Sequence, residues 1–164
     1  DNTYSSNVLI ETVGQYPVTI TGKLYLYNLG DECESITGGW FKNYYGNGSS
    51  GTAQKNDRSM TVRGANNSNG AECGVMTKNS IDFSKYMLLN VEVNNLTDVT
   101  IGSIVIELRS SKEVPLNGTR YLNTIVKSNG VAVIDISSIN NICYIDLVGY
   151  YSSRGGDIYK VWLE

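Results

Sequence analysis

Apolar and polar residues alternate with a period of two along most of the chain. Within 17–27, Val18, Ile20, Leu24 and Leu26 fall on one side, and Thr, Lys and Tyr residues fall on the other. This period, with β-branched and aromatic residues, is typical of a half-buried β-strand. Similar stretches bounded by turn residues predict ten strands, over 17–27, 34–45, 59–63, 73–77, 87–93, 101–109, 120–127, 131–136, 142–151 and 158–163. We expect the strand over 34–45 to be interrupted at Gly38 and Gly39.

The spacing of these strands predicts the fold class. No window shows the 3.6-residue apolar repeat of an amphipathic helix, and we expect only short helical turns near 82–85 or 137–140. About ten short antiparallel strands at regular spacing predict an all-β fold, and the double-sheet jelly roll is a common arrangement for that number. We expect a linker or edge segment over 1–16 and a single jelly-roll domain over 17–164, with Pro17 at the boundary.

Composition strengthens the all-β prediction and excludes several classes of protein. The chain has 18 Asn and 17 Gly but only 4 Ala, a balance that favours turns over helices. With 13 Lys and Arg and a net charge of -3, it lacks the basic surface that a nucleic-acid binder needs. No apolar run approaches the roughly 18 residues of a membrane span, so we expect no membrane insertion.

The absence of histidine restricts the chemistry further. With His at 0, neither Ser-His-Asp nor Cys-His catalysis is available, nor is a His-ligated metal. Glycoside hydrolysis requires two carboxyl groups that face one groove. Asp135 and Asp146 lie in neighbouring predicted strands and are the candidates for such a pair. We expect both to be surface or turn residues instead. The sequence therefore predicts that the protein is not an enzyme.

Three cysteines are present, at positions 33, 73 and 143. Their spacing fits no metal motif, and an odd number leaves at least one thiol unpaired within the chain. Buried or half-buried free thiols are the expectation, and a bridge between Cys33 and Cys73 stays open as an alternative.

Two aromatic clusters are candidates for ligand binding. Sugar rings stack their C–H faces on aromatic planes, while Asn, Arg and Asp side chains bind the hydroxyls. Trp40, Tyr44 and Tyr45 precede a Gly/Ser loop and form the first cluster. Trp40 also fits a core position, and one of the two adjacent tyrosines must face outward.

The second cluster lies in the predicted hairpin loop between the last two strands. It comprises Tyr150, Tyr151, Arg154 and Asp157. Loops on a rigid sandwich often carry binding groups. The alternative is that Arg154 and Asp157 simply form a solvated ion pair, which would contribute little to stability.

Some sequence strings resemble those of known families. LYNLGDECESITGGW (26–40) resembles segments in structural proteins of phages and prophages of low-GC Gram-positive bacteria. IDFSKYMLLNVEV (81–93), VAVIDISSINNICYIDL (131–147) and IYKVWLE (158–164) resemble strands of the galactose-binding-like jelly roll of carbohydrate-binding modules. The resemblance implies a β-sandwich at a phage tail or baseplate that touches the host surface.

Jelly rolls of that kind often hold a structural calcium near their first and last strands. The resemblance therefore makes Asp31 or Glu32, with Glu164, candidate calcium ligands, since calcium takes carboxylate and carbonyl oxygens. No DxDxDG loop is present in the sequence.

These observations lead to one functional hypothesis and its alternatives. We expect a non-catalytic domain of a phage or prophage tail-associated protein that binds a bacterial cell-surface polysaccharide, presented as a homotrimer or another multivalent assembly. It would act outside the cell or on the virion, and lie in the bacterial cytoplasm during assembly. The alternatives are an assembly domain of the particle without a sugar site, and a carbohydrate-binding module of a bacterial glycoside hydrolase or adhesin.

Overall fold

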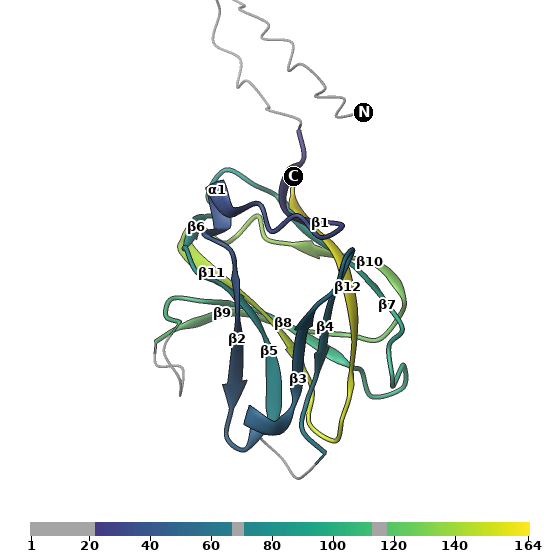
Figure 1. Cartoon of the computed structure of the whole chain (residues 1–164). Coiled ribbons are helices and arrows are strands. Elements are labelled where there is room, and N and C mark those ends of the chain that lie inside the picture. Colours follow the sequence, from purple (N-terminus) through teal and green to yellow (C-terminus); the bar gives the residue numbers. More distant parts are fainter. Residues whose placement is uncertain (1–21, 67–70, 113–117) are drawn as a thin grey trace, which may run out of the picture.

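The computed structural model describes residues 22–66, 71–112 and 118–164, which form two antiparallel sheets packed face to face (Figure 1). The all-β sandwich predicted from the sequence is confirmed, and the segment expected over 1–16 lies outside the described residues. Sheet A contains β1 (Leu24–Asn28), β3 (Thr52–Lys55), β4 (Met60–Arg63), β7 (Leu88–Asn94), β10 (Gly130–Asp135) and β12 (Gly155–Leu163). Sheet B contains β2 (Trp40–Tyr45), β5 (Glu72–Thr77), β6 (Ile81–Asp82), β8 (Ile104–Arg109), β9 (Arg120–Val126) and β11 (Ile142–Gly149).

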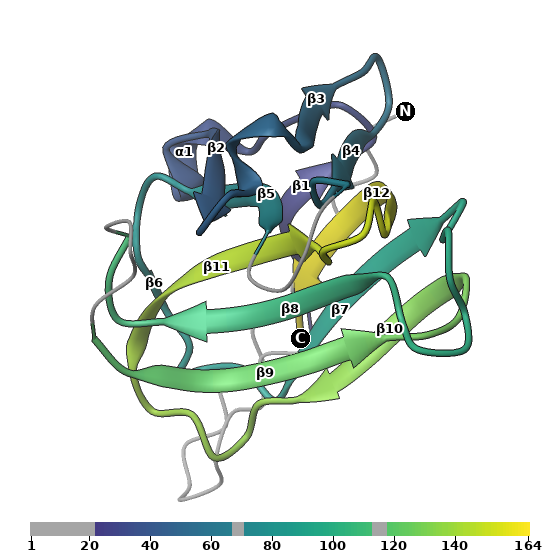
Figure 2. The same cartoon turned by 90° about the horizontal axis from the view of Figure 1, so that it is seen from below.

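The chain crosses between the sheets repeatedly, as in a jelly roll. Sheet A runs β10-β7-β12-β4-β3, and β1 shares one edge of β12 with β4. Sheet B runs β2-β5-β11-β8-β9, and β6 shares one edge of β11 with β5. Figure 2 shows β2 and β5 at a steep angle to β8 and β9, so sheet B is strongly twisted.

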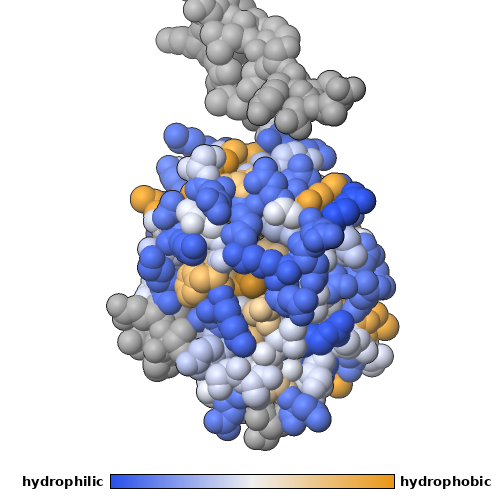
Figure 3. Space-filling model, in the orientation of Figure 1, coloured by the Kyte–Doolittle hydropathy of each residue, from blue (hydrophilic) through white to orange (hydrophobic). Residues whose placement is uncertain are grey.

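The core lies between the sheets and follows the alternation read from the sequence. The inward residues predicted for β7 and β8 are confirmed as fully buried: Leu89, Val91, Val93, Ile104, Ile106 and Leu108. Met87, also expected inward, is 62% exposed because β7 begins one residue later. The surface seen in Figure 3 is largely hydrophilic, with hydrophobic residues in small separate patches.

The strand predicted over 34–45 is interrupted at Gly38 and Gly39 as expected, but the part before the interruption is helical. A single helical turn, α1 (Glu34–Thr37), precedes β2. Cys33 and Gly38, at its two ends, have left-handed backbone conformations with φ of 48° and 68°. The Thr37 hydroxyl fixes the turn, since its Oγ1 donates to the Glu32 carbonyl at 2.7 Å and accepts from Gly39 N–H at 3.0 Å. Local side chain–backbone bonds thus override the extended preference of the segment.

The described residues contain twelve strands where the sequence predicted about ten. The additional strands are β3, which has no apolar alternation, and β6, which has only two residues. The Gly/Ser loop after β2 contains a short 3-10 helix, η1 (Gly48–Ser50). The three cysteines are free, with those at 73 and 143 buried, which confirms the expected thiols. No helix within the described ranges is long and apolar enough to cross a membrane.

Candidate functional site

The side of sheet B that faces away from the core carries an unusual set of polar and aromatic residues. We call it the sheet B outer face, and its members are the strand positions that alternate with core positions. They are Phe41, Asn43 and Tyr45 on β2; Glu72, Gly74 and Met76 on β5; Tyr144, Asp146 and Val148 on β11; Val105, Glu107 and Arg109 on β8; and Asn123 and Ile125 on β9.

Strand register brings charged groups from distant parts of the sequence together at the centre of this face. Asp146 lies opposite Met76 on one side and Glu107 on the other, and Glu107 lies opposite Asn123. Asp146 is 0% exposed and Glu107 is 2% exposed. The central carboxyl groups are therefore desolvated, although they lie outside the hydrophobic core.

Asp146 is held by two donors from β2. The Tyr45 hydroxyl donates a short hydrogen bond to Asp146 Oδ2, and Asn43 Nδ2 donates to the same oxygen at 3.0 Å. Burial raises the pKa of Asp146 to about 7, with the Glu107 charge acting in the same direction and the two donors against it. Burial and the Asp146 charge also raise the pKa of Tyr45, so its hydroxyl stays protonated and remains a donor.

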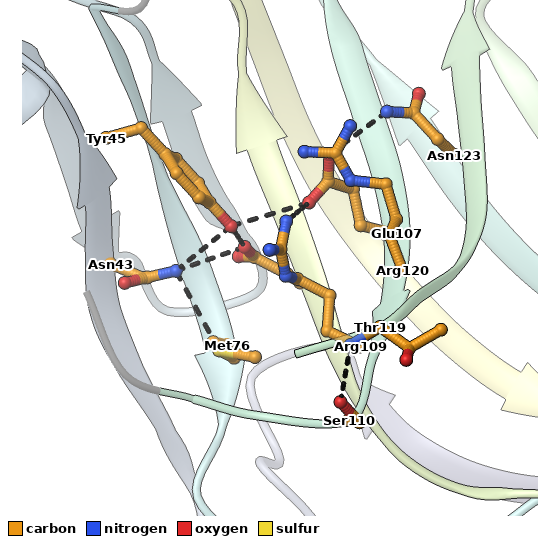
Figure 4. Close-up of polar contacts among 10 residues, drawn as sticks. Asn43, Tyr45, Met76, Glu107, Arg109, Ser110, Thr119, Arg120 and Asn123 are labelled. Atoms are coloured by element: carbon orange, nitrogen blue, oxygen red, sulfur yellow. Dashed lines mark hydrogen bonds and ion pairs between the residues drawn. The ribbon is translucent and has the colours of Figure 1, made fainter. Parts of the chain in front are cut away.

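Glu107 is the centre of an ion-pair network that reaches the surface. Its Oε2 lies 2.9 Å from Arg109 Nη1, and its Oε1 lies 3.2 Å from Arg120 Nη2. Asn123 Nδ2 donates to Oε1 at 3.2 Å. Figure 4 shows these side chains converging from β8 and β9 beside Tyr45. Arg120 is 46% exposed while Arg109 is 6% exposed, so the network runs from a buried guanidinium to an accessible one.

Partly exposed aromatic rings lie over and beside this network. Tyr45 lies with its ring centroid 5.7 Å from the Arg109 guanidinium carbon, and Tyr144 lies at the same distance from Lys112 Nζ. Phe41 is also partly exposed. The face therefore offers apolar planes and fixed polar groups close together.

A second aromatic group extends the face at the end of β11. Tyr150 directly follows Gly149, the last residue of β11, and continuing the alternation from Asp146 places it on the same side of sheet B. Glu72 is close enough that its charge contributes to raising the pKa of Tyr150. The Tyr150 ring centroid lies 4.3 Å from that of Tyr151. The Arg154 guanidinium carbon lies 5.3 Å and 5.0 Å from these two rings. Burial and the contact with Tyr151 raise the pKa of Tyr150.

The structure brings four of the sequence-predicted ligand-binding residues together and separates the others. Tyr45, Tyr150, Tyr151 and Arg154 lie on or beside the sheet B outer face.

Three predicted residues lie elsewhere. Trp40 is 1% exposed in the core, and its Nε1 donates to the Leu26 carbonyl at 3.0 Å, so the ring is not available for stacking on a ligand. Tyr44 points to the opposite side of β2 and is 40% exposed. Asp157 belongs to sheet A, where it accepts from Thr61 and Asn95 and does not pair with Arg154.

The candidate calcium ligands are not gathered into one group. Asp31 Oδ1 accepts from the Cys33 N–H, Glu32 pairs with Lys55 and accepts from the Trp40 N–H, and Glu164 pairs with Lys23. Across the described ranges there is no cluster of three or more Cys, Asp or Glu side chains suited to a metal ion. Calcium binding stays a prediction from sequence resemblance.

The carboxylate pair considered from the sequence is also different in the structure. Asp135 lies on β10 of sheet A, where it accepts from Ser137, whereas Asp146 lies on β11 of sheet B. The expectation that they occupy neighbouring strands is wrong, because consecutive strands here belong to different sheets. Asp146 is not a surface group either, and its neighbour is Glu107.

Four polar residues of this face were not predicted from the sequence as site residues: Asn43, Glu107, Arg109 and Asn123. Alternation in 104–109 places Glu107 and Arg109 opposite the core residues of that strand. Asp146 interrupts an otherwise apolar stretch of β11 in the same way. Charged residues inside apolar strands are the signal that could have located the network.

Comparison with known proteins gives no family. No protein-family model matches the sequence, and no curated protein matches it. One solved structure that is similar is chitosan-binding module 1 of a chitosanase/glucanase from Paenibacillus sp. IK-5. It has 11% sequence identity and a TM-score of 0.45, over 83% of this chain and 98% of that one. Such a distant likeness carries no function to this chain, so its function is argued below from its own residues.

Proposed function

We propose that the sheet B outer face, extended by Tyr150, Tyr151 and Arg154, binds a polysaccharide chain without cleaving it. The observation that carries this proposal is the placement of partly exposed rings on one face with charged groups that are already fixed by one another. Tyr45 on β2 lies opposite Glu72, and Tyr150, which follows β11, is near enough to Glu72 for its charge to act on the Tyr150 pKa.

The rings supply the apolar part of the contact. Pyranose rings present C–H groups that pack against aromatic planes, and tyrosine adds a hydroxyl at its edge. Tyr45, Tyr144 and Tyr150 are all half-buried, so each ring is held by neighbours yet keeps accessible surface. A chain molecule can contact several such rings at once, which increases affinity.

The polar groups supply orientation. Arg120 and Asn123 are exposed at the surface, and Glu107 holds both at 3.2 Å. Since these side chains are already ordered, binding costs less conformational entropy than it would with free side chains. Guanidinium and amide groups donate to sugar hydroxyls.

The buried carboxyl groups favour binding over hydrolysis. A glycosidase needs two carboxyl groups that flank the scissile bond and admit water. Asp146 and Glu107 lie on adjacent strands, but they are 0% and 2% exposed, and the Tyr45 hydroxyl donates to Asp146. Their role in this proposal is to position the residues above them.

A glycan array probed with the purified chain tests the proposal. We expect binding to at least one polysaccharide, with Tyr45→Ala and Tyr150→Ala each reducing affinity by about tenfold or more, equivalent to about 1.4 kcal/mol. Tyr44→Ala is the matched control, because Tyr44 is adjacent in β2 and points away from the face. Equal losses for Tyr44→Ala and Tyr45→Ala, or no binding by the wild type, would contradict the proposal.

The biological setting proposed is a phage or prophage tail-associated protein that binds its host's surface polysaccharide. It is supported by the string at 26–40, which resembles phage structural proteins. A whole-cell assay on low-GC Gram-positive bacteria tests this setting. Binding only to plant or fungal polysaccharides would instead favour a module of a glycoside hydrolase or adhesin.

A further inference from the structure

The strand β10 forms an edge of sheet A with regular backbone pairing on one side. All its residues from Gly130 to Asp135 pair in register with β7, without a bulge. Its outward side chains Val131 and Val133 are 48% and 60% exposed. A flat edge strand with exposed apolar side chains is a template for a further strand.

Three other edge strands in the described residues carry features that discourage strand addition. On β3, at the opposite edge of sheet A, Lys55 forms an ion pair with Glu32. On β2, Lys42 Nζ donates to the carbonyls of Ser49 and Gly51 at 3.3 Å. On β9, a register shift accompanies the charged Arg120. Between Gly130 and Ile134, by contrast, β10 has no charged residue.

We propose that β10 pairs with β10 of a second copy of this chain, antiparallel and about a two-fold axis at Ala132. An antiparallel pair of identical strands satisfies the two-fold symmetry that most homodimers have. This register places Val131 opposite Val133 of the second copy, and the reciprocal pair is equivalent. The two sheets A become one continuous sheet, and the edge N–H and C=O groups gain partners.

The sequence favours this register over its neighbours. The register centred on Ala132 places Asp135 opposite Asn129 of the second copy, so no like charges lie opposite each other. A shift centred on Val133 would place Asp135 against Val131. A shift centred on Val131 would leave Val133 opposite Asn129, which precedes the strand. Only the register at Ala132 pairs both valines with valines inside the strand bounds, and cross-strand β-branched pairs stabilise such contacts.

The test is sedimentation equilibrium of the full chain over a wide concentration range. We expect a reversible dimer. Val131→Lys together with Val133→Lys places like charges opposite each other and raises the dimer dissociation constant by at least about tenfold. Val131→Lys with Val133→Glu places opposite charges across the axis and restores the dimer. Tyr44→Lys, at an edge of the other sheet, leaves it unchanged.

Both valines are exposed, so the substituted chains should fold as the wild type does, which far-UV circular dichroism checks. A wild-type chain that is monomeric at all concentrations would overturn the proposal. So would a double-lysine variant that dimerises as the wild type does. Because β10 belongs to sheet A, this result is independent of carbohydrate binding on sheet B.

Discussion

The charged residues on the outer faces of the two sheets differ in their exposure to solvent. On sheet A, Lys160 Nζ lies 3.1 Å from Glu92 Oε2, and these side chains are 30% and 27% exposed. On sheet B, Arg109 lies 2.9 Å from Glu107, and these side chains are 6% and 3% exposed. The same pleat and the same alternation thus produce a solvated ion pair on one face and a desolvated network on the other.

The difference bears on function because the two arrangements have different energetic consequences. A solvated pair contributes about 0–1 kcal/mol and tolerates substitution. A desolvated network costs free energy to form and is strongly destabilising when one partner is removed. It does, however, fix the positions of its members. In our proposal the rigid face of sheet B therefore recognises the ligand, and sheet A provides the assembly edge at β10.

Removing the central carboxylate should have the largest effect. Glu107→Ala leaves the buried Arg109 guanidinium without the carboxylate at 2.9 Å, and we expect the free energy of unfolding to fall by about 3–5 kcal/mol. Glu92→Ala, the matched change on sheet A, should cost about 1 kcal/mol or less. Urea denaturation measures both. Similar losses for the two variants would show that the faces do not differ.

The next largest effect is expected on the pH dependence of the free energy of unfolding. Burial raises the pKa of Asp146 from 3.8 to about 7, so the folded chain binds more protons than the unfolded chain between these values. The free energy of unfolding should therefore decrease as pH rises through this window. Between pH 5 and pH 8 we expect a loss of about 2–3 kcal/mol from this group.

Asp146→Asn should remove that component, leaving the contributions of the other acidic groups. Urea denaturation of both proteins at the two pH values isolates the difference. An identical pH dependence for the wild type and Asp146→Asn would mean that Asp146 titrates normally.

A smaller effect is expected from Tyr45→Phe, which keeps the ring and removes the hydroxyl. Asn43 is then the remaining donor to Asp146 among the described residues, and unfolding free energy should fall by about 1–3 kcal/mol at pH 8. Because the ring stays, polysaccharide affinity should change far less than in Tyr45→Ala. Isothermal titration calorimetry compares the two variants, and equal affinity losses would assign binding to the hydroxyl instead.

The smallest effect concerns the solvated pair of sheet A. A double-mutant cycle of Lys160→Ala and Glu92→Ala should give a coupling free energy below about 1 kcal/mol that decreases with added salt. A salt-insensitive coupling of several kcal/mol would show that sheet A also carries a rigid charged network.

The strand pattern could be predicted from the sequence because local alternation determines which side chains face the core. Alternation correctly placed Ile104, Ile106 and Leu108 inside, and it left Glu107 on the outer side. It could not reveal that Glu107 lies between Asp146 and Asn123, because strand register depends on long-range pairing. Trp40 shows the same limit, since local sequence fitted both a core position and a ligand contact.

The central claim is that carbohydrate binds the sheet B outer face. The most direct measurement is amide chemical-shift mapping by NMR, with the glycan that binds most tightly on the array. We predict that the largest shifts lie in β2, β5, β8, β9 and β11 and at Tyr150 and Tyr151, with β7, β10 and β12 little changed. Shifts concentrated in β7, β10 and β12 would contradict the account.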